Sequence, residues 1–183
     1  QKLESDSLQK LRIWSAASST GQEAYSLVIL IDELCSLNLA WKGLDQRIEI
    51  LATDISRSAI SQAKRGEYDD FNMRRGLTEA RKSKSFAQEG QKWKISEKIK
   101  ERVHFKEFNL LDNFFSLGTF DLILCRNVAI YFSPEFRFEL YKKIHRALKS
   151  DSALIVGSME SIREYAPNFT IREKVNAIYY EPK

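Results

Sequence analysis

The 183-residue sequence contains little cysteine and little histidine, and it has no long hydrophobic run. Its two cysteines, Cys35 and Cys125, lie 90 positions apart, which fits neither a disulfide framework nor a zinc site. Two histidines are too few for a histidine-based metal centre, so we expect no metal. No apolar run reaches the ~18 residues of a membrane span, and the polar start lacks the apolar core of a signal peptide. These absences favour a cytoplasmic protein of a reducing compartment, without membrane insertion.

The sequence does contain enough apolar material for a sizeable core. Hydrophobic residues make up 43%, against ~45–50% in ordinary globular chains, and there are 11 Phe, 7 Tyr and 3 Trp. Charged residues make up 30%, yet the net charge is only +4, so the composition excludes disorder as the main state. At roughly 150 residues per domain, the length predicts one domain over residues 1–183.

Short apolar stretches typical of strands alternate with amphipathic stretches typical of helices. Strands are predicted over residues 11–16, 48–53, 103–108, 120–125 and 153–156, and a closing hairpin over residues 169–172 and 177–180. Helices are predicted over residues 20–37, 56–64 and 134–148. This alternation predicts an α/β fold with a mostly parallel sheet, to which the closing hairpin adds antiparallel strands.

Local signals define the helix ends and one helix face. Ser56 is the expected N-cap of the second helix and Gly66 its stop, and Ser133 followed by Pro134 is a typical start for the third. Apolar residues of the first helix recur at steps of three and four, which predicts one buried stripe. Its members are Ala24, Leu27, Val28, Ile31 and Leu34.

Residues 69–102 interrupt the alternation with a long, polar and basic stretch. Between residues 73 and 102, ten Lys and Arg stand against four Glu, a net charge of +6. A basic stretch is usually a solvated face, but it also attracts acidic partners. We expect an insertion or a reordered connection on one face of the sheet.

In open α/β sheets ligands bind beyond the carboxyl ends of the strands, so the residues after each predicted strand are site candidates. After the first strand, residues 15–26 are a run of small residues with one glycine that leads into a helix. Small residues let a ligand approach the backbone, and a helix start offers free N–H groups. The run lacks the three-glycine dinucleotide fingerprint, and a tight turn without a ligand would look similar.

Two further strand ends carry polar residues that suit a nucleoside. Asp54 ends the second strand, where a carboxylate can accept hydrogen bonds from both hydroxyls of a ribose. The alternative role for Asp54 is a helix N-cap, for which Ser56 competes. Asn109 follows the third strand, where its amide offers a donor and an acceptor to an adenine edge or acts as an ordinary turn residue. Signals at successive strand ends together favour a nucleoside ligand.

The strand predicted over residues 120–125 leads directly into Arg126 and Asn127, with Tyr131 shortly beyond. An arginine at the rim of a central strand is costly to bury unpaired, and a carboxylate partner would remove that cost. The alternative is a structural salt bridge to an internal acid. The candidate acids are Asp54, Asp121 and Glu160.

Four segments resemble, in order and spacing, the motifs of the CheR family, the chemotaxis receptor methyltransferases. They are residues 12–26 (RIWSAASSTGQEAYS), residues 50–56 with 63–68 (ILATDIS and AKRGEY), residues 105–112 (FKEFNLLD) and residues 121–132 (DLILCRNVAIYF). The run Cys-Arg-Asn-Val-x-Ile-Tyr-Phe is specific, and the likeness extends over residues 11–180. It implies a Rossmann-like, S-adenosylmethionine-dependent methyltransferase fold, with residues 69–102 as a small inserted β-subdomain.

The family uses S-adenosylmethionine, with S-adenosylhomocysteine as product, to methylate glutamate side chains of membrane chemoreceptors. The resemblance therefore implies a protein-glutamate O-methyltransferase that acts on the cytoplasmic signalling region of chemoreceptors, which the inserted subdomain contacts. The cofactor-binding residues that it implies are Ala16, Ser18, Thr20, Glu23, Asp54, Asn109, Leu110 and Asn127. The catalytic residues that it implies are Arg126, Asn127 and Tyr131. We expect a monomer without a nucleic-acid partner.

The sequence also departs from the family pattern. Ala17 stands where the family usually has glycine, Gln22 where it often has Glu, and Ala24 where it often has Pro. The helical N-terminal domain of the family and its Phe-Phe-Arg segment, which helps cover the cofactor, are missing, so the sequence is a C-terminal fragment or the protein has lost that lid.

Two rival functions follow from these observations. The missing lid favours a non-catalytic, cofactor-binding sensor or scaffold with the same fold. The +6 segment suits a methyltransferase of nucleic acids, but the Asn/Asp-Pro-Pro-aromatic motif of amino-group methyltransferases is absent.

Overall fold

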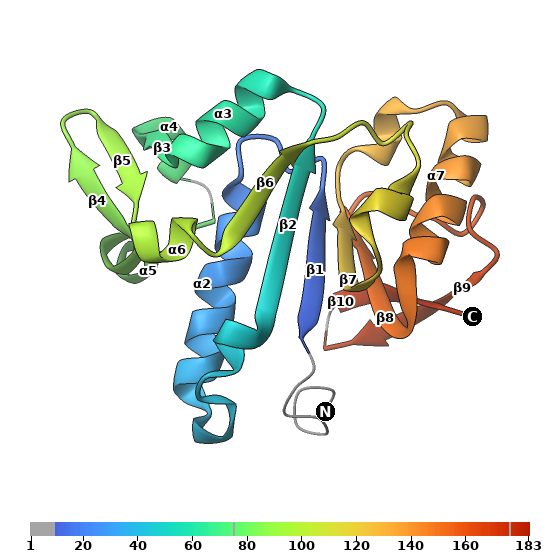
Figure 1. Ribbon diagram of the computed structural model, residues 1–183, viewed down its shortest axis with the longest axis horizontal. Coiled ribbons are helices and arrows are strands. Elements are labelled where there is room, and N and C mark those ends of the chain that lie inside the picture. Colours follow the sequence, from blue (N-terminus) through green and yellow to red (C-terminus); the bar gives the residue numbers. More distant parts are fainter. Residues whose placement is uncertain (1–9, 75, 176) are drawn as a thin grey trace.

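The protein is described here by a computed structural model covering residues 10–74, 76–175 and 177–183. Its main sheet has seven strands in the order β6-β2-β1-β7-β8-β10-β9. The first five strands in that order pair in parallel, and β10 pairs antiparallel with β8 and β9 (Figure 1). The strands are β1 (Leu11–Ala16), β2 (Ile48–Asp54), β6 (Val103–Glu107), β7 (Phe120–Cys125), β8 (Leu148–Val156), β9 (Phe169–Lys174) and β10 (Ala177–Pro182). The predicted α/β class and closing hairpin are confirmed.

Helices cover both faces of this sheet. The main ones are α2 (Gln22–Leu37), α3 (Arg57–Arg65) and α7 (Pro134–Ala147), and short 3-10 turns η1 (Leu39–Trp41), η2 (Leu44–Arg47), η3 (Phe114–Leu117) and η4 (Ala129–Tyr131) connect elements. Successive side chains of β1 point to opposite faces of the sheet, so the core has two parts. Trp14 packs in the hydrophobic cluster that includes residues of α7, and Ile13 packs in the cluster that includes residues of α2. Among the described residues, no helix is long and apolar enough to cross a membrane.

The predicted helix signals are confirmed at the caps but only partly on the face of α2. Ser56 and Ser133 accept hydrogen bonds from the backbone N–H groups of Ala59 and Phe136, and Gly66 ends α3 in a left-handed conformation with φ 68°. Helix α2 begins two residues later than predicted, after Gly21.

The buried stripe of α2 differs from the predicted one. Its members are Ala24, Tyr25, Val28 and Ile29, whereas Leu34 is 51% exposed and Leu27 and Ile31 are half-buried. The reason is long-range, because Tyr25 and Ile29 belong to a cluster that includes Tyr68 and Ile95 of the inserted segment. Strand β8 is also longer than predicted, since it begins directly after α7.

The basic segment contains a second, three-stranded antiparallel sheet, hereafter the inserted sheet, in the order β3-β5-β4. Its strands are β3 (Glu67–Asp69), β4 (Phe86–Glu89) and β5 (Lys92–Ile95), and the short helices around it are α4 (Asp70–Met73), α5 (Glu79–Ser85) and α6 (Glu97–Lys100). Figure 1 shows it in green beside the β6 edge of the main sheet. The predicted small inserted β-subdomain is therefore present.

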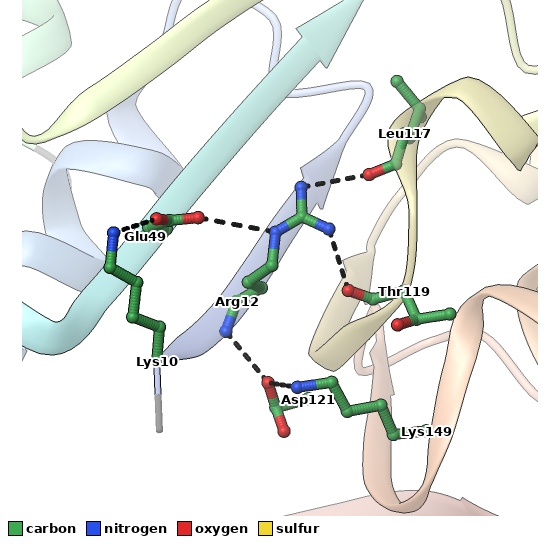
Figure 2. A network of polar contacts seen from close by, with 7 residues as sticks. All are labelled: Lys10, Arg12, Glu49, Leu117, Thr119, Asp121 and Lys149. Atoms are coloured by element: carbon green, nitrogen blue, oxygen red, sulfur yellow. Dashed lines mark hydrogen bonds and ion pairs between the residues drawn. The ribbon is translucent and has the colours of Figure 1, made fainter. Parts of the chain in front are cut away.

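A polar network fixes the amino-terminal end of β1, away from the strand ends that carry the candidate site residues (Figure 2). The Arg12 guanidinium donates to the carbonyl oxygens of Thr119 and Leu117 at 2.9 and 3.0 Å. The backbone N–H of Arg12 donates to a carboxylate oxygen of Asp121, and this carboxylate also forms an ion pair with Lys149. These contacts tie β1 to β7 and to the turn before it, and they give Asp121 a structural role.

Crowding at Gly66 generates a first prediction. A Cβ atom there would lie 2.5 Å from Cγ2 of Ile95, so Gly66→Ala adds overpacking to the cost of a left-handed alanine. We expect it to lower the free energy of unfolding by about 2–4 kcal/mol. Gly43→Ala is the control, because Gly43 also has a positive φ (83°) but a Cβ there meets nothing within 4 Å. Its expected cost is about 1 kcal/mol. Urea denaturation measures the free energy of unfolding of both variants, and equal losses would contradict the crowding at Gly66.

Candidate functional site

The order of the strands places a switch point between β1 and β7. From β1 the chain moves outward through β2 to β6, and it then returns to β7 on the opposite side of β1. Ala16 and Cys125, the last residues of β1 and β7, are partners in register. In α/β sheets ligands bind outside the carboxyl ends of the strands at such a point. Most of the residues predicted from the strand ends therefore lie at the edge of the sheet where a ligand is expected.

The loop between β1 and α2, residues 17–21, has a strained backbone. Ala17 and Ser19 adopt left-handed conformations with φ 57° and 50°, which non-glycine residues rarely do. Ala17 stands where the resemblance leads one to expect glycine, and its conformation is one that glycine adopts without strain. The Ser18 N–H donates to the carbonyl oxygen of Thr53 at 2.8 Å. The Ser18 hydroxyl is buried and has no hydrogen-bond partner within the described part of the chain, so it is available to a ligand.

Asp54 stabilises this loop from the end of β2. One carboxylate oxygen accepts from the N–H of Ser19 at 2.8 Å, and the other accepts from the N–H of Ser56 at 2.9 Å. The N-cap of α3 is Ser56, so the N-cap alternative for Asp54 is wrong. A carboxylate has about four lone-pair sites, which leaves acceptor capacity for the hydroxyls of a ligand.

Asn109 lies after β6, in a loop adjoining Asp54, since the N–H of Phe108 donates to the carbonyl oxygen of Asp54 at 2.9 Å. Its side-chain oxygen accepts from the N–H of Leu111 at 2.9 Å, so it also has the turn role considered as the alternative. The side-chain NH₂ group remains as a donor for a ligand. Leu110 next to it is 6% exposed and packs into the core.

Lys143 of α7 organises the same loop, and sequence reasoning missed it. Its ammonium donates to the carbonyl oxygens of Leu110, Leu111 and Asp112 at 2.6, 2.9 and 3.0 Å. Burial lowers the pKa of Lys143 from its ordinary value. No sequence signal points to this contact, because a lysine on an amphipathic helix normally faces water.

Arg126 leaves the end of β7 and pairs with Glu23 of α2. The distance from Nη1 to Oε2 is 2.8 Å, and the other Glu23 oxygen accepts from the hydroxyl of Ser15 at 2.7 Å. The Arg126 side chain is 40% exposed, so its guanidinium can be reached from solvent at the carboxyl edge of the sheet. The salt-bridge alternative is thus correct in kind, but none of the three acids proposed for it is the partner. Asp54 holds the loop of residues 17–21, Asp121 holds Arg12, and Glu160 holds Asn127.

Asn127 is fixed through its backbone by Glu160, a contact that the sequence did not reveal. Asn127 has φ 58°, and its N–H donates to Oε2 of Glu160 at 2.7 Å. The N–H of Gly157 donates to the same oxygen, while Oε1 of Glu160 is buried without a hydrogen-bond partner among the described residues. Burial raises the pKa of the neighbouring Cys125 thiol, which therefore stays protonated.

The structure brings most of the predicted site residues together, and two lie further out. Thr20 is on the side of the loop that faces the inserted sheet, where its carbonyl oxygen accepts from the Tyr68 hydroxyl. Tyr131 lies in η4 with 80% of its surface exposed. In the described ranges its hydroxyl makes no hydrogen bond to the other candidates, so Tyr131 belongs to the rim.

Comparisons with known proteins show the family to which the chain belongs. The family model "CheR methyltransferase, SAM binding domain" matches residues 1–178. The chain is 42% identical over 176 residues to chemotaxis protein methyltransferase 1 of Pseudomonas aeruginosa, covering 96% of this chain and 64% of that protein. It is 39% identical over 176 residues to chemotaxis protein methyltransferase Cher2 of Pseudomonas putida, covering 96% and 63%. The chain thus spans less than two thirds of the length of these relatives.

A solved structure supports the fold alone. The TehB-like SAM-dependent methyltransferase of Corynebacterium glutamicum superposes with a TM-score of 0.55 at 14% identity, over 96% of this chain and 82% of that one. The cofactor in the family description is S-adenosylmethionine, and the residues present fit it, because Ser18 offers a buried unpartnered hydroxyl and Asp54 retains free acceptor sites. The chain belongs to the CheR methyltransferase family, whose S-adenosylmethionine-binding domain it contains.

Proposed function

We propose that this chain is the methyl-transfer domain of a protein-glutamate O-methyltransferase that acts on the cytoplasmic signalling region of chemoreceptors. The family match and the names of the chemotaxis relatives support this proposal. The observation that carries it is Arg126, a half-exposed guanidinium held by Glu23 at the carboxyl end of a central strand. A guanidinium in this position suits the orientation of a substrate carboxylate.

The proposed roles in cofactor binding follow the contacts of each side chain. S-adenosylmethionine, when bound, supplies an electrophilic methyl group on a positively charged sulfur. Asp54 accepts from the ribose hydroxyls with the lone pairs that Ser19 and Ser56 leave free. The Asn109 amide donates to the adenine edge, and Leu110 supplies an apolar wall. The small residues Ala16 and Ser18, with Glu23, frame the methionine part.

A glutamate substrate needs little chemical activation. Its carboxylate has a pKa of about 4.3, so it is already ionised at neutral pH and no general base is required. Arg126 uses one N–H on Glu23 and has further donors for the substrate carboxylate. Because Glu23 shares the charge of Arg126, the substrate oxygen is oriented without losing much nucleophilicity. Catalysis is then mainly alignment and exclusion of water.

Asn127 and Tyr131 complete the proposed catalytic set. Asn127 is held in a left-handed conformation by Glu160, and its side-chain amide lies close to Gly157 at the end of β8. Tyr131 at the exposed rim offers an aromatic face, and such a face favours a nearby cation.

The ribose role of Asp54 can be tested with an isosteric change. Asp54→Asn keeps the shape and one acceptor but removes the charge, so the loss expected for a hydrogen bond to a charged group is about 1.5–3 kcal/mol. This corresponds to about 10- to 150-fold weaker binding of S-adenosylmethionine in calorimetry. Glu107→Gln is the matched control, because Glu107 ends β6 beside Asp54 in register and pairs outward with Arg57. Equal affinities of the two variants would remove Asp54 from the site.

The role of Arg126 is tested by separating binding from transfer. Arg126→Gln is expected to lower the rate of methyl transfer to receptor by about 100-fold, the scale of a misaligned reacting group, while cofactor affinity stays near wild type. Tritiated methyl transfer and calorimetry measure the two quantities, and a melting curve controls for loss of the Glu23 pair. An unchanged transfer rate would contradict the proposal. A wild-type protein that binds cofactor but transfers no methyl group would instead support the sensor or scaffold alternative.

We also propose that residues 69–102 dock an acidic, helical surface of the receptor. Many cations of this segment already have partners within the described chain. Arg81 pairs with Glu33, Arg102 with Asp32, Lys92 with Glu67, Lys94 with Glu89 and Lys100 with Glu97, and Lys82 lies over the Trp93 ring. The exposed cations Lys84 and Lys98 make no ion pair with the described residues, so they are the better candidates for steering a partner.

Charge reversal tests this docking role. The double variant Lys84→Glu, Lys98→Glu is expected to slow receptor methylation at low salt and to flatten its salt dependence, because rim charges mainly accelerate encounter. Cofactor affinity should stay the same. The control is Lys42→Glu with Lys174→Glu, which makes the same change in net charge outside the segment. The measurement is the initial rate of receptor methylation as a function of ionic strength. If the curves of the two double variants superimpose, the segment does not dock the receptor and is only a solvated face.

A further inference from the structure

The inserted sheet reaches the cofactor loop through one buried tyrosine. Tyr68 of β3 is 2% exposed, and its hydroxyl donates to the carbonyl oxygen of Thr20 at 2.8 Å. Thr20 belongs to the strained loop of residues 17–21. Tyr68 ends the motif segment of residues 63–68, but it is not among the site residues that the resemblance implies.

The loop depends on constraints from its surroundings, because strained backbone persists only where neighbouring contacts hold it. The backbone N–H groups of Ser18 and Ser19 are held by β2 and Asp54, and the N–H of Gly21 donates to Ser18 within the loop. Tyr68 adds a constraint from outside the main sheet. It acts on the peptide group that joins Thr20 to Gly21, so both ends of that peptide are hydrogen-bonded.

Tyr68 is itself rigidly held. Its ring packs edge-on against Phe86 of β4 at 6.2 Å between centroids, and it pairs in register with Trp93 of β5. Burial raises the pKa of Tyr68, so its hydroxyl remains a donor at physiological pH. A second, weaker link lies beside it, where the Gln22 amide donates to the Asn72 side chain at 3.3 Å. The inserted sheet and the loop are therefore mechanically connected.

We propose that Tyr68 is a positioning residue for the cofactor: its hydroxyl holds the Thr20 carbonyl and thereby keeps residues 17–21 in the conformation that binds the ligand. This inference rests on the proposed function, in which that loop frames the methionine part of S-adenosylmethionine. It assigns the inserted sheet a role in preparing the cofactor site, in addition to any role in docking a receptor.

The test is Tyr68→Phe, which removes one hydroxyl and keeps the ring in the core. Thr20 is half-buried, so its carbonyl can bond to water instead and the protein is expected to fold. Loss of one typical hydrogen bond from a preorganised loop predicts about 3- to 10-fold weaker binding of S-adenosylmethionine. Hydrogen exchange of residues 17–21 should become faster at the same time.

Tyr25→Phe is the matched control. Tyr25 is 1% exposed in the same core cluster, and its hydroxyl donates to the carbonyl oxygen of Ala63 in α3 at 2.6 Å. It loses the same kind of buried bond, so a similar fall in melting temperature is expected, with cofactor affinity and loop exchange unchanged. This contrast separates positioning from general destabilisation.

The outcomes are distinguishable. Weaker binding and faster loop exchange in Tyr68→Phe, but not in Tyr25→Phe, would support the proposal. Wild-type affinity in Tyr68→Phe, or equal effects of the two variants, would overturn it. A wild-type protein that does not bind S-adenosylmethionine would contradict the proposed function, and the difference in loop exchange would then still decide whether Tyr68 holds the loop.

Discussion

The carboxyl edge of the main sheet depends on the parallel pairing of β1 with β7. This pairing sets Ala16 beside Cys125, and the loops that follow the two strands carry Ser18 on one side and Arg126 on the other. A slip of one residue would turn every side chain of β1 to the opposite face, including the fully buried Trp14. The contacts of Arg12 at the other end of β1 resist such a slip, so packing at the amino-terminal end of β1 helps to set the geometry at its carboxyl end.

Three carboxylates at the carboxyl edge of the main sheet orient other groups by accepting hydrogen bonds from them. Asp54 binds two backbone N–H groups, Glu160 binds two, and Glu23 binds Arg126 and a serine hydroxyl. Each acid therefore has a fixed orientation before any ligand arrives. A site whose dipoles and charges are already oriented needs little reorganisation during reaction, and this is the main source of electrostatic catalysis. The arrangement supports the proposed reaction, in which the substrate carboxylate is the nucleophile.

Local chemistry made much of the fold predictable, and distance in the sequence set the limit. Ser56, Ser133 and Gly66 could be assigned because a cap needs only its own side chain and the next few residues. The strand-end pattern located Asp54 and Arg126 at the carboxyl edge of the sheet, because a strand and the residue that follows it are also local in the sequence. The partner of Arg126 could not be found, since Glu23 lies 103 positions away and a helix-start glutamate has many roles.

The face of α2 shows the same limit. Leu34 fits a helical stripe, but the inserted sheet covers Tyr25 and Ile29 instead, and periodicity within one helix carries no information about a distant cover. The contact of Lys143 with three carbonyl oxygens was hidden for a similar reason. Interactions between a loop and a helix depend on how the whole chain folds, and a single sequence does not reveal them.

The closure of the inserted segment on itself has a consequence for how the chain folds. The N–H of Ile95 donates to the carbonyl oxygen of Gly66 at 2.9 Å, so the segment begins after α3 and ends before α6 at nearly the same place. Once that bond forms, the search that brings β6 alongside β2 spans a short effective connection, because loop-closure entropy depends on the length left open. A change in the length of the segment would thus have little effect on the rate at which the parallel sheet assembles.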